Sequence, residues 1–410
     1  EVSEALNRHV DGYEIVTPEV YSAGRERAFV DAMLRTVEKR EAALHYMLET
    51  YPIDFGLLVY NESDGIQHKL WPADGFGEGE PPWPASGIWE VYERLDRAVG
   101  RLADHLGPDA NLLVISDHGA GPMRGVMFVN RWLMDQGYLR LRRSPSVGLK
   151  RFLAWTDLLV RGYYLASRVG LGRLGRLFSP KTRTQVATSF ISFDDVDWSR
   201  SVAYSFGSCG QVFLNLRGRE REGIVEPGAE ADRLLDEIAG RLRQVRDPDT
   251  GRDLITEVWR PRDLFHGPAM ADAPDLMFPI DDYARDASLR FGIGQTSFLG
   301  EPESWTRGAH RMDGIFIAAG PDIAPGARVQ GMALADVAPT ALHLVGLPVP
   351  EDMDGRVVAE ILSGPAAERA PARSAPGAAP SAGPAEASAA MSDEEQQAVE
   401  DRLRDLGYLD

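Results

Sequence analysis

The 410-residue sequence has little cysteine, no long apolar run and a shortage of positive charge, and each lack excludes a class of protein. Its single cysteine, Cys209, excludes a disulfide framework within the chain and any Cys-x-x-Cys zinc site, so a bound metal needs histidine and carboxylate ligands. No run of about 18 apolar residues, the length of a membrane span, is present. The net charge of −18 argues against binding to a nucleic-acid duplex.

The apolar pattern predicts an α/β fold. Helical spacing of apolar residues at 24–50 and 88–106 alternates with continuous apolar runs at 55–60 and 111–116, which are typical of buried parallel strands. Strand, helix and strand at this spacing predict a mainly parallel sheet with helices on its faces. Further strands are predicted within 201–216, 274–278 and 314–318, and further helices at 229–245 and from residue 336.

Composition divides the chain into a core and three other segments. Residues 140–186 hold eleven Lys or Arg and one acidic residue, Asp157, which predicts an inserted basic helical cap. The insert is interpreted as a solvated cap, as a rim that steers an anionic substrate, or as a membrane-surface patch. The predicted domains are a core over 1–139 and 191–362, the insert at 140–190, a disordered Ala/Pro linker at 363–391, and an amphipathic helix at 392–410 that docks on the core or binds a partner.

The sequence Asp117-His118-Gly119 directly follows the predicted strand at 111–116. In open parallel sheets the functional site lies just beyond the carboxyl ends of the strands, so both metal-capable side chains are expected at that edge. A loop pair bonded to the backbone is the structural alternative. Asp64 and His68 follow the other predicted strand, and at helical spacing i and i+4 they point the same way. The alternative there is an ordinary surface turn.

His310, in the loop before the predicted strand at 314–318, adds a third imidazole. Zinc prefers histidine nitrogen and carboxylate oxygen, so Asp64, His68 and His310 would complete most of one site, and Asp117 with His118 half of a second. Two divalent ions about 4 Å apart would clamp the oxygens of a phosphoryl displacement. They would bring more positive charge than these two carboxylates neutralise, and so attract a phosphate.

Several stretches, in order, resemble the type I phosphodiesterase/nucleotide pyrophosphatase branch of the alkaline phosphatase superfamily. They include SDGIQH at 63–68, ISDHG at 115–119 and GAHRMDG at 308–314; the others are residues 130–133, 137–139, 215–219, 266–268, 336–340, 353–356 and 406–409. The resemblance implies an alkaline-phosphatase-like three-layer sandwich with a mainly parallel central sheet. It also implies that Asp64, His68 and His310 bind one metal ion and Asp117 and His118 another, most simply zinc, with manganese as the alternative.

The same resemblance implies a hydrolase of small phosphodiester or pyrophosphate substrates. The family also uses a further Asp ligand and a Thr or Ser nucleophile, which we expect upstream of Glu1, so this chain alone is expected to be inactive. The alternatives are a phosphomonoesterase or phosphomutase of the same superfamily, and a catalytically silent binding module. We predict a cytoplasmic location, and the first residues look like the middle of a protein.

Four other residues carry weaker predictions. His266, beside Gly267, is interpreted as a loop histidine or as a substrate contact. Asp275 is expected either to orient a metal-bound histidine or to cap the start of a strand. Trp71 and Trp132 are predicted to be core residues rather than residues that stack on a substrate.

Overall fold

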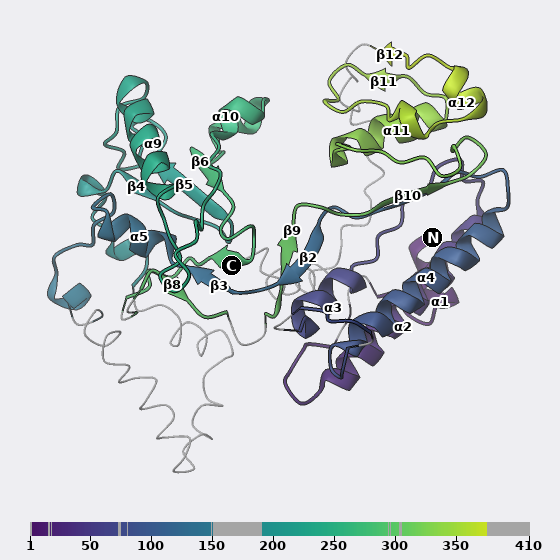
Figure 1. Cartoon of the computed structure of the whole chain (residues 1–410), viewed down its shortest axis with the longest axis horizontal. Coiled ribbons are helices and arrows are strands. Elements are labelled where there is room, and N and C mark those ends of the chain that lie inside the picture. The colour runs from purple at the N-terminus through teal and green to yellow at the C-terminus, as the bar shows by residue number, and fades with distance from the viewer. Residues whose placement is uncertain are drawn as a thin grey trace. The chain divides into compact units, whose positions relative to one another are not determined.

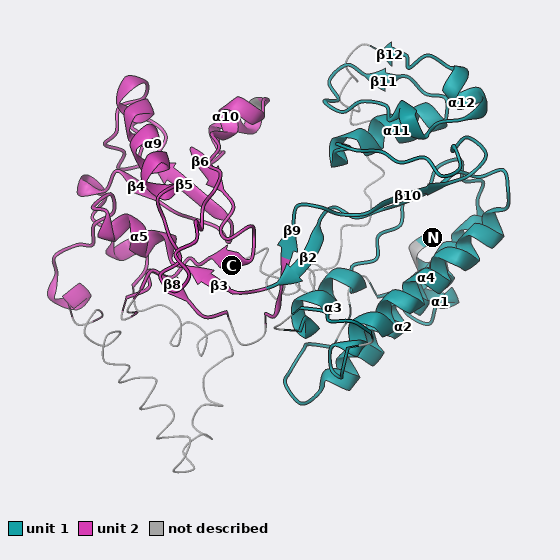
Figure 2. Cartoon of the chain, in the orientation of Figure 1, with its two compact units in different colours: residues 1–122, 310–409 teal, residues 123–309, 410 magenta. Residues whose placement is uncertain are grey.

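A computed structural model of the chain describes residues 2–374, except 151–190 and short gaps at residues 15–16, 18, 73–74, 80, 149, 294, 296 and 303–305. Figure 1 shows the elements, and Figure 2 the two compact units that they form. Unit 1 comprises residues 1–122 and 310–409, and unit 2 residues 123–309 and 410. Within the described part of the chain, no helix has the length and apolar character needed to cross a membrane.

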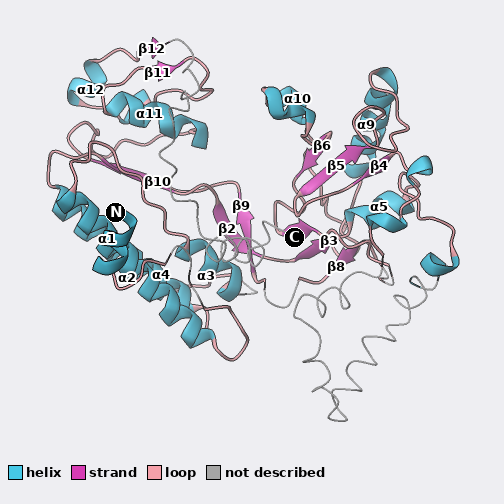
Figure 3. Ribbon diagram, turned by 180° about the vertical axis from the view of Figure 1, so that it is seen from behind, coloured by secondary structure: helices cyan, strands magenta, loops and turns pink. Residues whose placement is uncertain are grey.

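Three helices of unit 1 enclose its main hydrophobic cluster. They are α2 (Glu26–Thr50), α3 (Glu62–Leu70) and α4 (Ser86–Leu106), preceded by the short α1 (Val2–His9). The helices α2 and α4 lie side by side (Figure 3). Phe29 and Met33 of α2, Ile66 and Leu70 of α3, and Val91 of α4 are almost fully buried in this cluster. The periodicity that predicted α2 and α4 is confirmed, because each helix buries one apolar face.

The segment 55–60 is not the buried strand that its apolar run predicts. It pairs with no other strand among the described residues. Phe55, Leu57 and Val59 are 62%, 76% and 56% exposed. A continuous apolar run becomes a buried strand only where other elements cover both of its faces, and no described element does so here.

The strands of unit 1 form two-stranded ladders. β1 (Leu112–Ile115) pairs antiparallel with β10 (Phe316–Ala319), and β2 (Gly119–Pro122) pairs with β9 (Gly308–Arg311). The last two residues of β9, His310 and Arg311, belong to unit 1. The predicted strand at 111–116 is therefore present, but all four residues of β1 are only partly buried.

The C-terminal part of unit 1 is tied together by buried polar contacts. Its elements are η5 (Leu334–Asp336), α11 (Val337–Leu344), β11 (Val349–Pro350), η6 (Ala359–Ile361), α12 (Gly364–Glu368) and β12 (Arg373–Ser374). The carboxylate of Asp336 accepts the backbone N–H of Arg356 at 2.8 Å, and Thr340 Oγ1 accepts that of Val358 at 3.0 Å. These contacts give the sequence motifs at 336–340 and 353–356 a structural role.

The linker prediction is wrong for residues 364–374, which hold α12 and β12. Ala366 is fully buried in a cluster with Val358 and Ile361, so an alanine-rich segment gains order here by fitting small side chains against a formed core. The rest of the predicted linker, the C-terminal helix and most of the basic insert lie outside the described residues.

Unit 2 is built around a separate, larger core. Its elements are β3 (Gly125–Met127), α5 (Val129–Asp135), η2 (Phe193–Asp195), η3 (Trp198–Arg200), β4 (Ala203–Tyr204), β5 (Gly210–Leu214), α9 (Ala229–Leu242), α10 (Pro261–Leu264), η4 (Pro268–Ala271), β6 (Leu276–Phe278), β7 (Arg285–Ala287) and β8 (Leu299–Gly300). The sheets have the strand orders β4-β5-β6 and β7-β3-β8. Trp132 of α5, 3% exposed, lies in this core as predicted.

The predicted mainly parallel central sheet is not confirmed. The described sheets have two or three strands each. The pairs β1–β10, β3–β8, β4–β5 and β5–β6 are antiparallel, and the pairs β3–β7 and β11–β12 are parallel. The physical reason is visible at β1, whose partner β10 lies about 200 residues later in the chain. Apolar periodicity specifies which segments extend, but strand direction depends on partners that are distant in sequence.

Candidate metal centre

Helix α3 places two predicted ligands on one side and core residues on the other. Ile66 and Leu70 are buried against α2 and α4, and this packing fixes the rotation of the helix about its axis. Asp64 lies in the first turn, where a carboxylate suits the helix dipole, and His68 lies in the last turn. At spacing i and i+4 the two side chains meet, with His68 Nε2 3.2 Å from Asp64 Oδ1.

The loop after β1 approaches the chain just before β10 very closely. Ser116 Oγ accepts a hydrogen bond from the backbone N–H of Ile315 at 2.8 Å. A side chain at Gly119 would overlap the carbonyl oxygen of Asp313, and one at Gly314 would overlap Ser116 Oγ. Glycine is thus required at both positions by close backbone approach, and this approach brings the loop at residues 116–119 beside β9.

Asp64, His68 and His310 converge to form a triad. The Nε2 atoms of His68 and His310 are 3.0 Å apart, and His310 Nε2 lies 3.6 Å from Asp64 Oδ1. One ligand atom from each residue falls within 4.8 Å of the other two. The structure therefore brings together three of the five predicted ligands, from α3 and from β9.

His118 lies against this triad, and Asp117 lies at its edge. The imidazole of His118 stacks on that of His310 with ring centroids 3.8 Å apart, and His118 Nε2 is 3.8 Å from Asp64 Oδ1. Asp117 Oδ1 lies 3.7 Å from His118 Nε2 and accepts the backbone N–H of His118 at 3.1 Å. The side chain of Asp117 is 75% exposed. Three imidazoles therefore surround Asp64, and Asp117 faces solvent.

The electrostatics of the triad keep Asp64 ionised. Burial of its carboxylate acts to raise its pKa, but the contacts with His310 and His68 outweigh burial and hold the pKa well below its usual range. An ionised carboxylate among imidazoles is the state that a metal ligand requires.

The two remaining candidates, His266 and Asp275, lie in unit 2. His266 is exposed in the loop between α10 and η4. Asp275 accepts the backbone N–H of Leu214 at 2.6 Å and hydrogen bonds from Arg219 at 2.7 and 3.1 Å. This network favours the strand-cap interpretation of Asp275, and it gives the motif at residues 215–219 a structural role.

The sequence analysis missed a group of aromatic residues next to α3. Trp71, predicted to be a core residue, is partly buried and packs against the hydrophobic cluster of unit 1, and it also lines a pocket with Trp89 and Tyr92 of α4. The pKa of Tyr92 is raised, mainly by burial and further by the negative charge of Asp64. The available signal was the spacing of Trp89 and Tyr92, which lie three residues apart on one side of α4.

Comparison with known protein families shows which family the chain belongs to. The family model described as "Type I phosphodiesterase / nucleotide pyrophosphatase" matches residues 9–282, and the chain belongs to this family. The family comprises hydrolases with an alkaline-phosphatase-like α/β fold that generally use divalent metal ions. The match includes Asp64, His68, Asp117 and His118 and ends before His310. A search of curated proteins and a search of solved structures each found no match.

Proposed function

We propose that this protein hydrolyses phosphodiester or pyrophosphate bonds with two divalent ions, zinc first and manganese as the alternative. The observation that carries the proposal is the convergence of Asp64, His68 and His310 in a member of a family of such hydrolases. When bound, the ions supply Lewis-acid stabilisation of the negative charge that develops on the phosphoryl oxygens.

The spacing of the triad supports its fit to one zinc ion. Ligand atoms at about 2.0–2.1 Å from a tetrahedral zinc ion lie roughly 3.3 Å from one another. The spacings of 3.0, 3.2 and 3.6 Å lie on both sides of this value. Without a cation, one of the two facing Nε2 atoms of His68 and His310 must carry a proton and donate it to the other. A shared cation would accept both lone pairs.

His118 is oriented as a ligand for the second ion. Its Nδ1 lies 3.0 Å from the carbonyl oxygen of Gly119, a contact in which Nδ1–H donates. This hydrogen bond leaves the lone pair on Nε2, the nitrogen that faces Asp64. With Asp117 beside it, His118 would provide half of a second site, and Asp64 lies close enough to contribute to both.

The nucleophilic hydroxyl of the proposed reaction is neither of the two hydroxyl groups that lie next to the ligands in the chain. The two hydroxyl residues adjacent to ligands are engaged with the backbone, since Ser116 Oγ accepts the Ile315 N–H and Ser63 Oγ donates to the Tyr60 carbonyl oxygen at 3.3 Å. The role assigned to the residues of this chain is therefore to hold the ions and to orient the phosphoryl group.

Metal analysis of purified variants tests the ligand assignment. We expect about two zinc ions per chain. Asp117→Ala or His118→Ala should lower this number to about one by emptying the second site, and His68→Ala or His310→Ala should empty the triad site. His105→Ala, at an exposed histidine near the end of α4, is the control and should leave the zinc content unchanged. Unchanged zinc in the ligand variants would refute the assignment.

Activity of the zinc-loaded protein tests the reaction class. We expect hydrolysis of a chromogenic diester to exceed that of the matching monoester, and chelation to abolish both. A dominant monoester rate would instead favour a phosphomonoesterase.

A further inference from the structure

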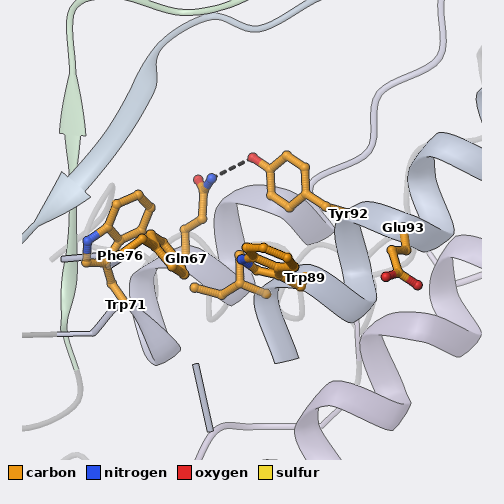
Figure 4. Close-up of a pocket in the computed structure, with 7 residues that line it drawn as sticks. Gln67, Trp71, Phe76, Trp89, Tyr92 and Glu93 are labelled. Carbon is orange, nitrogen blue, oxygen red and sulfur yellow. Dashed lines mark hydrogen bonds between the residues drawn. The ribbon is translucent and has the colours of Figure 1, made fainter. Parts of the chain in front are cut away.

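An open surface pocket of about 340 Å³ lies in unit 1 beside α3. Figure 4 shows its lining, in which Trp71 and Phe76 lie on one side of Gln67 and Trp89 on the other. Tyr92 and Ile88 of α4 complete the wall, and Glu93 stands next to them. The volume is at the lower end of the roughly 300–1,000 Å³ that small-molecule sites occupy.

The lining favours an apolar, ring-shaped group over a polar one. Its surface is almost entirely apolar. The polar ends of Gln67 and Tyr92 are joined to each other by a hydrogen bond of 2.5 Å, so they are already engaged. Trp71 and Phe76 meet edge to face at 5.0 Å between centroids, an arrangement that a further aromatic ring can extend.

The pocket and the metal triad share α3. At about 100° per residue, Gln67 lies about 60° around the helix from Asp64, and Trp71 about 40° from Gln67. The stripe formed by Gln67 and Trp71 therefore borders the stripe formed by Asp64 and His68. The charge of Asp64 acts on Tyr92 across this border. A molecule held at the triad thus has the pocket next to it.

The exposure of the aromatic residues supports a ligand-binding role. Phe76, Trp89 and Tyr92 are 36%, 42% and 42% exposed although all three are large and mainly apolar. Isolated exposed aromatics are ordinary, but several around one cavity are typical of a binding site.

We propose that this pocket, lined by Trp71, Phe76, Trp89 and Tyr92, binds an apolar ring of the phosphoester whose phosphoryl group is held at the triad. The inference rests on the proposed hydrolytic function and specifies its substrate as a diester that carries an aryl group.

The kinetic test uses two diesters with the same p-nitrophenyl leaving group, one retaining a phenyl group and the other a methyl group. On the zinc-loaded protein we expect kcat/KM to favour the phenyl diester at least tenfold, as apolar pockets do for added carbon. Trp89→Ala should remove most of this preference without lowering the rate on the methyl diester to the same extent. The control Trp83→Ala removes an equally exposed tryptophan that lies outside the pocket, and should keep the preference.

The binding test needs no turnover. Tryptophan fluorescence of the zinc-loaded protein should respond to phenylphosphonate at concentrations at least tenfold lower than to methylphosphonate, and Trp89→Ala should abolish the difference. Equal affinity for the two phosphonates in the unsubstituted chain would overturn the proposal. The proposal would also be overturned if Trp89→Ala lowered the hydrolysis of a thymidine diester more than that of the phenyl diester. The pocket would then recognise a hydrogen-bonding base. The protein could bind phenylphosphonate more tightly than methylphosphonate through Trp89 and yet hydrolyse no diester. That result would refute the hydrolytic function and leave the pocket assignment standing.

Discussion

The buried ion pair between α2 and α3 should control the stability of unit 1. Arg40 of α2 and Glu62 of α3 have side chains only 7% and 2% exposed, and Arg40 Nε donates to Glu62 Oε1 at 3.0 Å. The other carboxylate oxygen of Glu62 is buried and has no hydrogen-bond partner among the described residues. Arg40→Met would leave the carboxylate of Glu62 buried without its cation.

The expected loss is large because the remaining charge has no access to water. Removing one partner of a buried pair costs about 3–5 kcal/mol, which corresponds to a change in the folding equilibrium of roughly 100-fold to 4,000-fold. Replacing both partners removes the stranded charge as well. The double variant Arg40→Met/Glu62→Gln should therefore recover most of the lost stability, the more so because Glu62 is incompletely paired in the native protein.

Amide hydrogen exchange measured on peptides from α2 and α3 reports the opening of unit 1 separately from unit 2. We expect exchange in Arg40→Met to accelerate by the factor given above. The matched control is Arg97→Met, which breaks the Arg97–Glu93 pair, 62% and 63% exposed, and should change stability by less than about 1 kcal/mol. A loss below about 1 kcal/mol in Arg40→Met, or a double variant less stable than the single one, would refute the reasoning.

Two further substitutions test close packing in each unit. Asn130→Ala should destabilise unit 2 by about 2–6 kcal/mol, because Asn130 is fully buried and makes hydrogen bonds of 2.9 Å with both backbone groups of Ser205. Faster amide exchange in α5 would report this loss, and a loss below about 1 kcal/mol would contradict the prediction. Gly119→Ala should destabilise unit 1 by about 1–3 kcal/mol and lower its zinc content, because the added methyl overlaps the Asp313 carbonyl oxygen. Gly100→Ala, in the open on α4, should instead stabilise by about 0.5–1 kcal/mol in urea unfolding, and equal effects of the two glycine variants would disprove the steric argument.

Local sequence was a sufficient guide where one element contains all the necessary information. The helices α2, α4 and α9 follow from apolar spacing alone, because each needs only one covered face. The pairing of Asp64 with His68 follows from the geometry of one helical turn. For the segment 55–60 the same kind of evidence failed, because burial on two faces depends on other elements.

The sequence alone therefore determined which residues were candidate ligands, and it placed two of them side by side. Tertiary structure decided the rest of the centre. His310 reaches His68 across 242 positions of sequence, because β9 pairs with β2 and the glycine-containing loops at Gly119 and Gly314 allow the backbones to approach. It also decided that Trp71, which packs against the hydrophobic cluster of unit 1, lines a pocket beside α3 as well. Helical periodicity acts over a few residues, whereas these contacts depend on the long-range packing of whole elements.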